Sequence, residues 1–129
     1  MIFFGANATE EDCWMHYSVL DASGNLTITN APVYGLRAPI VMHDIAITRN
    51  FSIVLDMPLF IVSDPQPGGS PYRHDTTAPA RFGVMPRHFE GGVEASRGIR
   101  WFEASTCFVY HMVRAVAVCG YTCSQGSVG

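Results

Sequence analysis

Residues 40–48 read Ile-Val-Met-His-Asp-Ile-Ala-Ile-Thr, and residues 51–56 read Phe-Ser-Ile-Val-Leu-Asp. Apolar residues, many of them β-branched, fill most of both runs, and only the polar pair Arg49-Asn50 separates them. Two such runs joined by a two-residue polar link are typical of a tight β-hairpin. The sequence therefore predicts strands over 43–48 and 51–56, with His43 inside the first strand.

The same alternation of apolar runs and turns extends along the rest of the chain. No stretch combines a helical period of apolar residues with helix caps, so the sequence predicts an all-β fold: a sandwich, a barrel or a propeller. The segment 63–79 is rich in Pro, Gly, Asp and Ser, which predicts a surface loop. The remaining strands are expected at 13–20 and 26–33, which flank a hairpin loop at 21–25, and at 59–62, 81–85, 99–103 and 107–113.

A second histidine, His111, stands in an apolar run like that of His43. Burying an unpaired polar group costs about 1–3 kcal/mol, so two histidines in matching contexts suggest a shared partner. Neutral imidazole is the commonest protein ligand for a metal, which makes a metal site the first hypothesis. Strand alternation would place Asp44 on the face opposite His43, so hydrogen bonding at a turn or between blades is expected for Asp44 rather than support of the imidazoles.

Composition limits the class of protein. Of the 129 residues 15% are charged and 48% are hydrophobic, whereas soluble domains carry about 25% charged residues. The shortage of charge suggests surfaces that more of the same polypeptide covers. A net charge of −3 without a basic cluster argues against nucleic acid as a partner, and no apolar run is long enough for a transmembrane helix.

The cysteines and the N-terminus add little. Cys13 and Cys107 stand alone in apolar runs, where a free thiol behaves as a small hydrophobe. The spacing of Cys119 and Cys123 allows zinc, but neither a second pair nor a nearby histidine completes such a site. Residues 1–12 turn acidic quickly and form no signal or transit peptide, so an intracellular location is expected.

Four stretches, in this order and spacing, resemble the carotenoid cleavage oxygenases, the family that also holds the epoxycarotenoid dioxygenases, the stilbene-cleaving oxygenases and the retinoid isomerase. The resemblance covers roughly residues 12–113. The four stretches are MHDIAIT at 42–48 with VLDMPL at 54–59, ARFGVMPR at 80–87, IRWFE at 99–103 and CFVYH at 107–111.

The resemblance implies a seven-bladed β-propeller that binds one iron(II) through four histidines, of which His43 and His111 would be the second and third. Residues 1–113 would form about two blades, a fragment of that propeller, and the other two ligands would lie outside this chain. After His111 the sequence no longer follows the pattern of the family. Residues 114–129 are expected to form a disordered tail outside it. The implied reaction is cleavage of a conjugated C=C bond of a carotenoid or apocarotenoid with O2.

Two hypotheses about this chain stay open. It is either an iron-dependent dioxygenase or a catalytically incompetent fragment with a structural or interaction role, because two of the four ligands are absent. The resemblance further implies plastid or cytoplasmic location and peripheral membrane contact of the longer protein. Three other histidines match no ligand position: His16, His74 and His88. The aromatic residues are mostly expected in the core. Arg81 and Arg100 are expected in ion pairs or as backbone caps.

Overall fold

The computed structural model describes residues 1–6, 13–89 and 97–113, and these residues form an all-β structure without an α-helix. The all-β expectation is confirmed. The seven-bladed propeller stays a prediction, since it concerns a longer chain. The strands in the described residues are β1 (Ile2–Ala6), β2 (Met15–Leu20), β3 (Leu26–Pro32), β4 (Ala46–Ile47), β5 (Phe51–Asp56), β6 (Leu59–Ile61), β7 (Tyr72–His74), β8 (Ala80–Pro86) and β9 (Arg100–Ala104).

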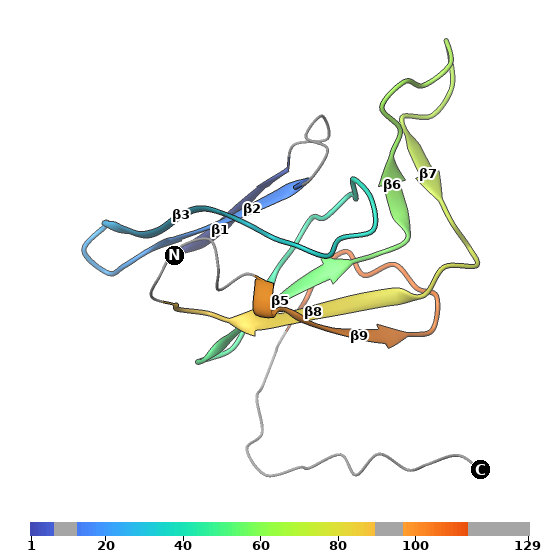
Figure 1. The fold of residues 1–129 in the computed structure, drawn as a ribbon. Coiled ribbons are helices and arrows are strands. Elements are labelled where there is room, and N and C mark those ends of the chain that lie inside the picture. The colour runs from blue at the N-terminus through green and yellow to red at the C-terminus, as the bar shows by residue number, and fades with distance from the viewer. Residues whose placement is uncertain (7–12, 90–96, 114–129) are drawn as a thin grey trace, which may run out of the picture.

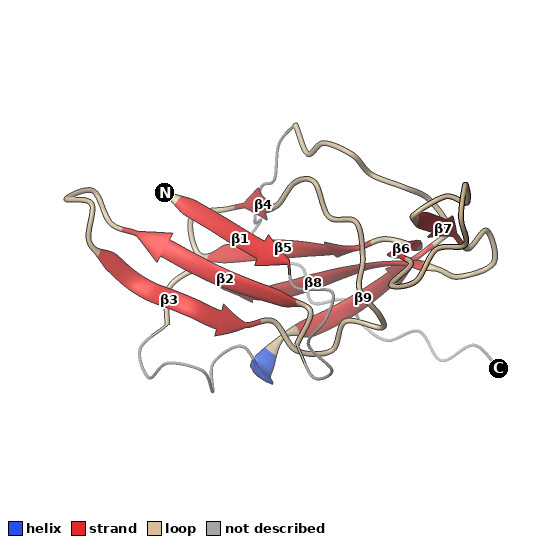
Figure 2. Cartoon of the chain, turned by 90° about the horizontal axis from the view of Figure 1, so that it is seen from above, coloured by secondary structure: helices blue, strands red, loops and turns tan. Residues whose placement is uncertain are grey.

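These strands form three antiparallel sheets. The first has the order β1-β2-β3, the second β4-β5-β8-β9, and the third is the β6-β7 hairpin. Figures 1 and 2 show the first two sheets as neighbouring layers and the β6-β7 hairpin as a projection from one end. In the four-stranded sheet β5 pairs with β8 and β8 pairs with β9. These pairings bring most of the family-like stretches of the sequence into one sheet.

Side chains in the two predicted hairpin loops explain why those hairpins form. In the β2-β3 loop the Asp21 carboxylate accepts hydrogen bonds from Ser23 N and Asn25 N, and Gly24 has φ of 84°. In the β4-β5 loop Thr48 Oγ1 accepts a hydrogen bond from Phe51 N at 2.9 Å. Such short-range side-chain bonds favour turns over continued strands. Both hairpins are confirmed.

Two strands lie outside the expected set. β7 interrupts the segment expected to be a loop, and its three exposed residues pair with β6 from His74↔Leu59 to Tyr72↔Ile61. Because the side chains of β7 are all exposed, the strand has no buried apolar face and no hydrophobic pattern marks it in the sequence. β1 pairs with β2 along its full length, Ile2↔Val19 to Ala6↔Met15.

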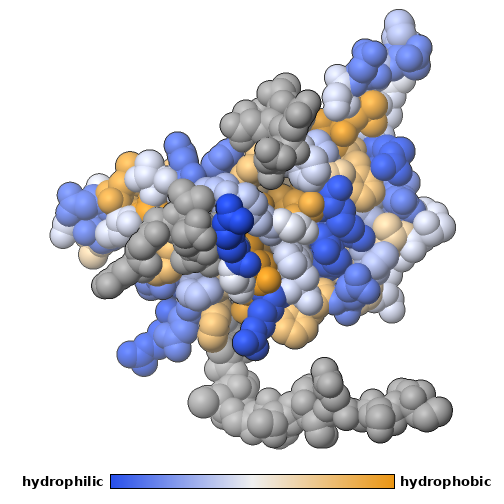
Figure 3. Space-filling model, in the orientation of Figure 1, coloured by the Kyte–Doolittle hydropathy of each residue, from blue (hydrophilic) through white to orange (hydrophobic). Residues whose placement is uncertain are grey.

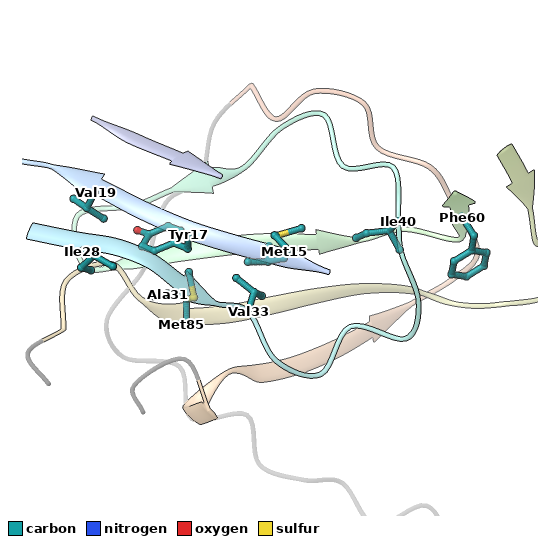
Figure 4. Close-up of a cluster of buried hydrophobic side chains, with 10 residues drawn as sticks. Met15, Tyr17, Val19, Ile28, Ala31, Val33, Ile40, Phe60 and Met85 are labelled. Carbon is teal, nitrogen blue, oxygen red and sulfur yellow. The ribbon is translucent and has the colours of Figure 1, made fainter. Parts of the chain in front are cut away.

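The main core fills the space between the first two sheets. Tyr17 and Met15 on β2 are each 1% exposed, and they face a layer that contains Val54 of β5 and Met85 of β8. Figure 4 shows this row of side chains, with Val19 and Ile28 at one end and Ile40 and Phe60 at the other. Burying a side chain of this kind contributes roughly 1.5–3 kcal/mol, so this layer holds the two sheets together.

β5 is buried on both faces. Val54 belongs to the main core, whereas the next residue, Leu55, belongs to a second cluster with Met57 and Ala80. A strand that is covered on both faces usually has a nearly continuous run of apolar residues. This explains why apolar residues predominate in positions 51–56 without strict alternation. The second cluster is covered by residues from the 107–113 segment, and it therefore carries one side of the candidate site.

A buried carboxylate joins β5 to β8. Asp56 is completely buried, and its Oδ2 accepts hydrogen bonds from Arg37 Nε at 3.0 Å and Arg81 Nε at 2.8 Å. Arg81 Nη2 contacts Asp56 as well and donates to the carbonyl oxygen of Gly35. The expected ion pair of Arg81 is confirmed, and it closes the β5-β8 pairing at Asp56↔Arg81.

The Trp101 indole occupies a slot between two glycines. A Cβ on Gly35 would lie 2.6 Å from Trp101 Nε1, and a Cβ on Gly83 would lie 2.7 Å from Trp101 Cζ3. The Arg81 guanidinium lies over the same ring, 4.6 Å from its centroid. Because these contacts hold the indole from several sides, only glycine leaves room for it at position 83.

Replacing Tyr17 by phenylalanine is expected to lower the free energy of unfolding by about 1–3 kcal/mol. The Tyr17 hydroxyl lies 2.7 Å from Ser52 Oγ and donates to the carbonyl oxygen of Arg87 at 3.1 Å. Ser52 is completely buried, so the variant leaves its hydroxyl without this partner. Urea unfolding would measure the change, with Tyr72→Phe at an exposed position of β7 as the matched control.

The pH dependence of stability tests the burial of the Tyr17 phenol. Burial raises the pKa of Tyr17 above its ordinary value. The neutral phenol is therefore favoured in the folded state, and its stabilisation is complete below pH ~10 and declines as the pH rises further. Tyr17→Phe should show less of this alkaline decline than the parent chain. An equal decline in both proteins would contradict the assignment.

The surface retains large apolar side chains. Phe102 on β9 is 56% exposed and Tyr110 is 53% exposed. Figure 3 shows hydrophobic residues interspersed with hydrophilic ones over the visible face. A membrane-spanning helix, long and apolar enough, does not occur in residues 1–6, 13–89 or 97–113.

Candidate functional site

The two predicted ligand residues lie beside strands, not within them. His43 precedes β4, which begins only at Ala46, and His111 lies in an extended segment, 107–113, that follows β9 and forms no strand. Both histidines are exposed, and the His111 side chain retains 66% of its accessible surface. The strand predicted over 43–48 is therefore confirmed only at 46–47, whereas the strand over 107–113 and the buried setting of both histidines are wrong.

Side-chain hydrogen bonds explain why strand pairing stops at these positions. Asp44 Oδ1 accepts a hydrogen bond from Ile45 N at 2.8 Å, and Asp44 Oδ2 accepts one from Met112 N at 2.7 Å. Both amides are thus engaged by a carboxylate instead of a neighbouring strand. Aspartate commonly competes with regular structure in this way.

Apolar packing determines which side chains of the two segments face inward. Met42, Phe108, Val109 and Met112 pack against the second cluster of Leu55, Met57 and Ala80. The histidines alternate with these anchors along the chain and remain at the surface. Val109 packs inward, whereas Cys107, His111 and Val113 are exposed, so these four residues do not share the one face that strand alternation would give them.

The two histidines, called the histidine pair below, converge although 68 positions separate them. Their ring centroids lie 5.0 Å apart, and the ring planes meet at 78°. Tyr110 stacks on the His43 ring with centroids 4.2 Å apart and an interplanar angle of 20°. The sequence predicted that His43 and His111 share a partner, and the structure brings them together.

The separation of the histidine pair fits two ligands of one metal ion. Imidazole nitrogen binds a divalent metal such as zinc at about 2.1 Å, so two rings on one ion have centroids roughly 4.5–5 Å apart. The distance between His43 and His111 is at the upper end of this range. Edge-to-face aromatic pairs span a similar distance, so the spacing is compatible with a metal and does not require one.

Asp44 lies between the segments of the histidine pair. Its Oδ2 is 4.0 Å from His111 Nδ1, too far for a hydrogen bond. The hydrogen bond from Met112 N lowers the pKa of Asp44 below its ordinary value. Partial burial opposes this shift, whereas the hydrogen bond from Ile45 N and the nearby histidines add to it. Asp44 is thus held as a carboxylate. The strand-based expectation that it faces away from the imidazoles is wrong, whereas its expected hydrogen-bonding role between segments is present.

The remaining donors lie elsewhere. His74 and His88 are exposed, and Cys13 is buried with its Sγ 2.9 Å from the carbonyl oxygen of Met15. Cys107 is exposed, contrary to the expectation of a buried thiol. The predicted zinc pair, Cys119 and Cys123, lies outside the described residues. Within the described ranges, no group of three His, Cys, Asp or Glu side chains could hold a metal ion.

Two contributors to the site were not identified from the sequence. Tyr110 was expected mainly as a core residue, and Asp44 was set aside because alternation placed it on the wrong face. The signal for both was their position: each stands next to one of the two histidines. Residues next to a candidate ligand in the sequence lie in the same site even where no strand forms.

Comparisons with known proteins agree with the motifs. The profile of the family described as retinal pigment epithelial membrane protein matches residues 1–117. The chain is 34% identical to carotenoid 9,10(9',10')-cleavage dioxygenase 1 of Arabidopsis thaliana, covering 89% of this chain and 20% of that protein. It is 34% identical to carotenoid dioxygenase carX of Gibberella fujikuroi, covering 76% of this chain and 14% of that protein.

A bacterial relative carries a different name. The chain is 32% identical to isoeugenol monooxygenase of Pseudomonas putida, covering 89% of this chain and 23% of that protein. The chain thus spans less than a quarter of the length of each of these three relatives. With its family profile matched over residues 1–117, the chain belongs to the retinal pigment epithelial membrane protein family, which includes carotenoid-cleaving dioxygenases.

Proposed function

We propose that this chain carries part of the iron(II) centre of an oxygenase that cleaves a conjugated C=C bond of a carotenoid or apocarotenoid with O2. The observation that carries the proposal is the convergence of His43 and His111, with ring centroids 5.0 Å apart. Both residues stand in the segments whose text resembles the family. The names of the relatives supply the reaction class.

The residues of this chain would hold and orient the metal. Neutral imidazole suits an iron(II) ion that must keep coordination positions open, and the bound iron would supply the activation of O2. Asp44 lies on the Nδ1 side of His111, which leaves Nε2 of that ring for the metal. Tyr110 limits rotation of the His43 ring by stacking on it.

An aromatic side chain at the site and the names of the relatives support the choice of substrate. The exposed Tyr110 ring stacks on His43, and Phe108 lies next to it with ring centroids 6.1 Å apart. Flat conjugated molecules pack well on an exposed aromatic ring. Two of the compared relatives are named for carotenoids and one for isoeugenol, so isoeugenol serves as the competing substrate in the test.

Iron binding tests the ligand pair. Loaded with Fe(II) under anaerobic conditions, the full chain should bind iron weakly, because two imidazoles form only half of a four-histidine set. At equilibrium dialysis against a fixed Fe(II) concentration, His43→Ala and His111→Ala should each lower the bound iron to background. Elemental analysis measures the content, and His74→Ala and His88→Ala are the matched controls, since both histidines are exposed and lie outside the pair.

Turnover separates the two hypotheses about the chain. Iron-dependent formation of cleaved products from an apocarotenoid, exceeding that from isoeugenol, would support an enzyme. Iron binding through the pair without any product would support the alternative of a catalytically incompetent fragment. Equal iron loss in His43→Ala and His74→Ala would contradict the ligand assignment.

A further inference from the structure

We propose that Asp44 is a positioning residue whose carboxylate fixes the 107–113 segment against the 43–45 segment and so sets the separation of the two imidazoles. The metal role of those imidazoles rests on the proposed function. The arrangement of Asp44 itself is a property of the chain without metal.

The argument begins with the two oxygen atoms of Asp44. Oδ1 accepts a hydrogen bond from Ile45 N at 2.8 Å, and Oδ2 accepts one from Met112 N at 2.7 Å. One bond fixes the side chain on its own segment, and the other reaches a segment 68 positions away. Hydrogen bonds to an ionised acceptor are about twice as strong as neutral ones.

The 107–113 segment depends on this bond for its register. Between described residues, no backbone-to-backbone hydrogen bond holds this segment to a neighbour. Phe108, Val109 and Met112 bury apolar surface against the second cluster, but apolar contact is not directional. The bond from Thr106 Oγ1 to the carbonyl oxygen of Ala78 holds the start of the segment, and the bond from Met112 N to Asp44 therefore fixes its far end, where His111 lies.

The positions of the bonded residues transmit this register to the rings. Asp44 follows His43 directly, and Met112 follows His111 directly. The inter-segment bond thus joins the two immediate neighbours of the histidine pair, and little backbone lies between the bond and either imidazole. The stacking of Tyr110 on His43, at 4.2 Å, depends on the same register.

A carboxylate is needed because two acceptors must point in two directions. Asparagine has one acceptor oxygen, and its amide nitrogen cannot accept the second N–H. Asp44→Asn can therefore satisfy Ile45 N or Met112 N, but not both. Asp44→Ala satisfies neither.

The test is carried out on the full chain without metal. In Asp44→Ala, nuclear Overhauser contacts between the His43 ring and the rings of Tyr110 and His111 should disappear, and hydrogen exchange of the Met112 amide should quicken by about tenfold or more. Resonances of core residues such as Val54 should stay in place. Asp44→Asn should be intermediate, and it decides the question if Asp44→Ala does not fold.

The matched control is Asp21→Asn. Asp21 also accepts two backbone hydrogen bonds through its carboxylate, but both come from its own hairpin loop. This variant should leave the ring contacts and the Met112 exchange rate unchanged. Ring contacts that persist in folded Asp44→Ala or Asp44→Asn would overturn the proposal.

A Co(II) titration, followed by its visible absorption, extends the test to the metal. Removing a group that orients a ligand typically weakens metal binding by about 10–100-fold, and Asp44→Ala should fall in that range. Unchanged affinity with loosened rings would leave the positioning role in place and would count against the ligand pair of the proposed function. Absence of Co(II) binding by the parent chain would count against the ligand pair of the proposed function, while the ring contacts would still decide the role of Asp44.

Discussion

Replacing Asp56 by alanine is expected to lower the free energy of unfolding by about 3–5 kcal/mol. Asp56 is completely buried, and two arginines, Arg37 and Arg81, donate to its Oδ2. The variant leaves both guanidinium groups without this carboxylate in a partly buried setting, with side-chain exposures of 26% and 14%. Since domains are stable by about 5–15 kcal/mol, this single change removes a large part of the total.

Urea unfolding of the full chain measures the effect. Asp64→Ala is the matched control, because Asp64 is exposed in the loop after β6. Asp56→Asn separates charge from shape, since the amide keeps the volume and one acceptor while it removes the ion pair. The assignment would be contradicted if Asp56→Ala unfolded at the same urea concentration as Asp64→Ala.

Replacing Gly83 by alanine is expected to destabilise the chain by about 1–3 kcal/mol through overpacking. The added Cβ would lie 2.7 and 2.8 Å from Trp101 Cζ3 and Cη2, and 3.0 Å from Ile99 Cγ2. The indole cannot retreat easily, because Gly35 borders its other end and Arg81 lies over its face. Interiors are close-packed, so a single methyl group is felt.

The control for this prediction is Gly5→Ala, in which the added Cβ has no neighbour within 4 Å. Both glycines lie in strands, so the pair isolates the steric effect from backbone entropy. Thermal unfolding should show a loss only for Gly83→Ala. In a Trp101→Leu background Gly83→Ala should cost less, and equal costs in both backgrounds would rule out a clash with the indole.

Local features of the fold could be predicted from the sequence, whereas long-range pairing could not. Both hairpin loops carry their own signals, an aspartate with a glycine in one and a threonine in the other. Nothing in the local pattern states that β5 pairs with β8. The segment of β7 was predicted as a loop because its residues are exposed and only its pairing with β6 makes it a strand.

The family motifs correspond to a connected part of the structure. The stretches at 42–48, 54–59, 80–87 and 99–103 include all of β4 and β8, most of β9 and half of β5, which form one sheet. Asp56, Arg81 and Trp101 all stand in these stretches, and Arg81 contacts both of the other two.

The convergence of the two histidines was predicted from the sequence, whereas the conformation of their segments was not. His43 and His111 converge as expected, although neither lies in a strand. Alternation failed here because the Asp44 carboxylate binds the amides of Ile45 and Met112 and ends strand pairing. A side-chain acceptor that replaces a strand partner cannot be seen in a hydrophobic pattern.

The pairing of β5 with β8 also has a consequence for folding kinetics. Asp56 and Arg81 stand 25 positions apart, and the β6-β7 hairpin lies between them. Because closing a loop costs entropy that rises with its length, a hairpin that forms first shortens the effective loop that β5 and β8 must close. Non-local strand pairing of this kind is slow. We therefore expect the ion pair at Asp56 to form after the β6-β7 hairpin and to stabilise a strand pairing that the hairpin has made less costly.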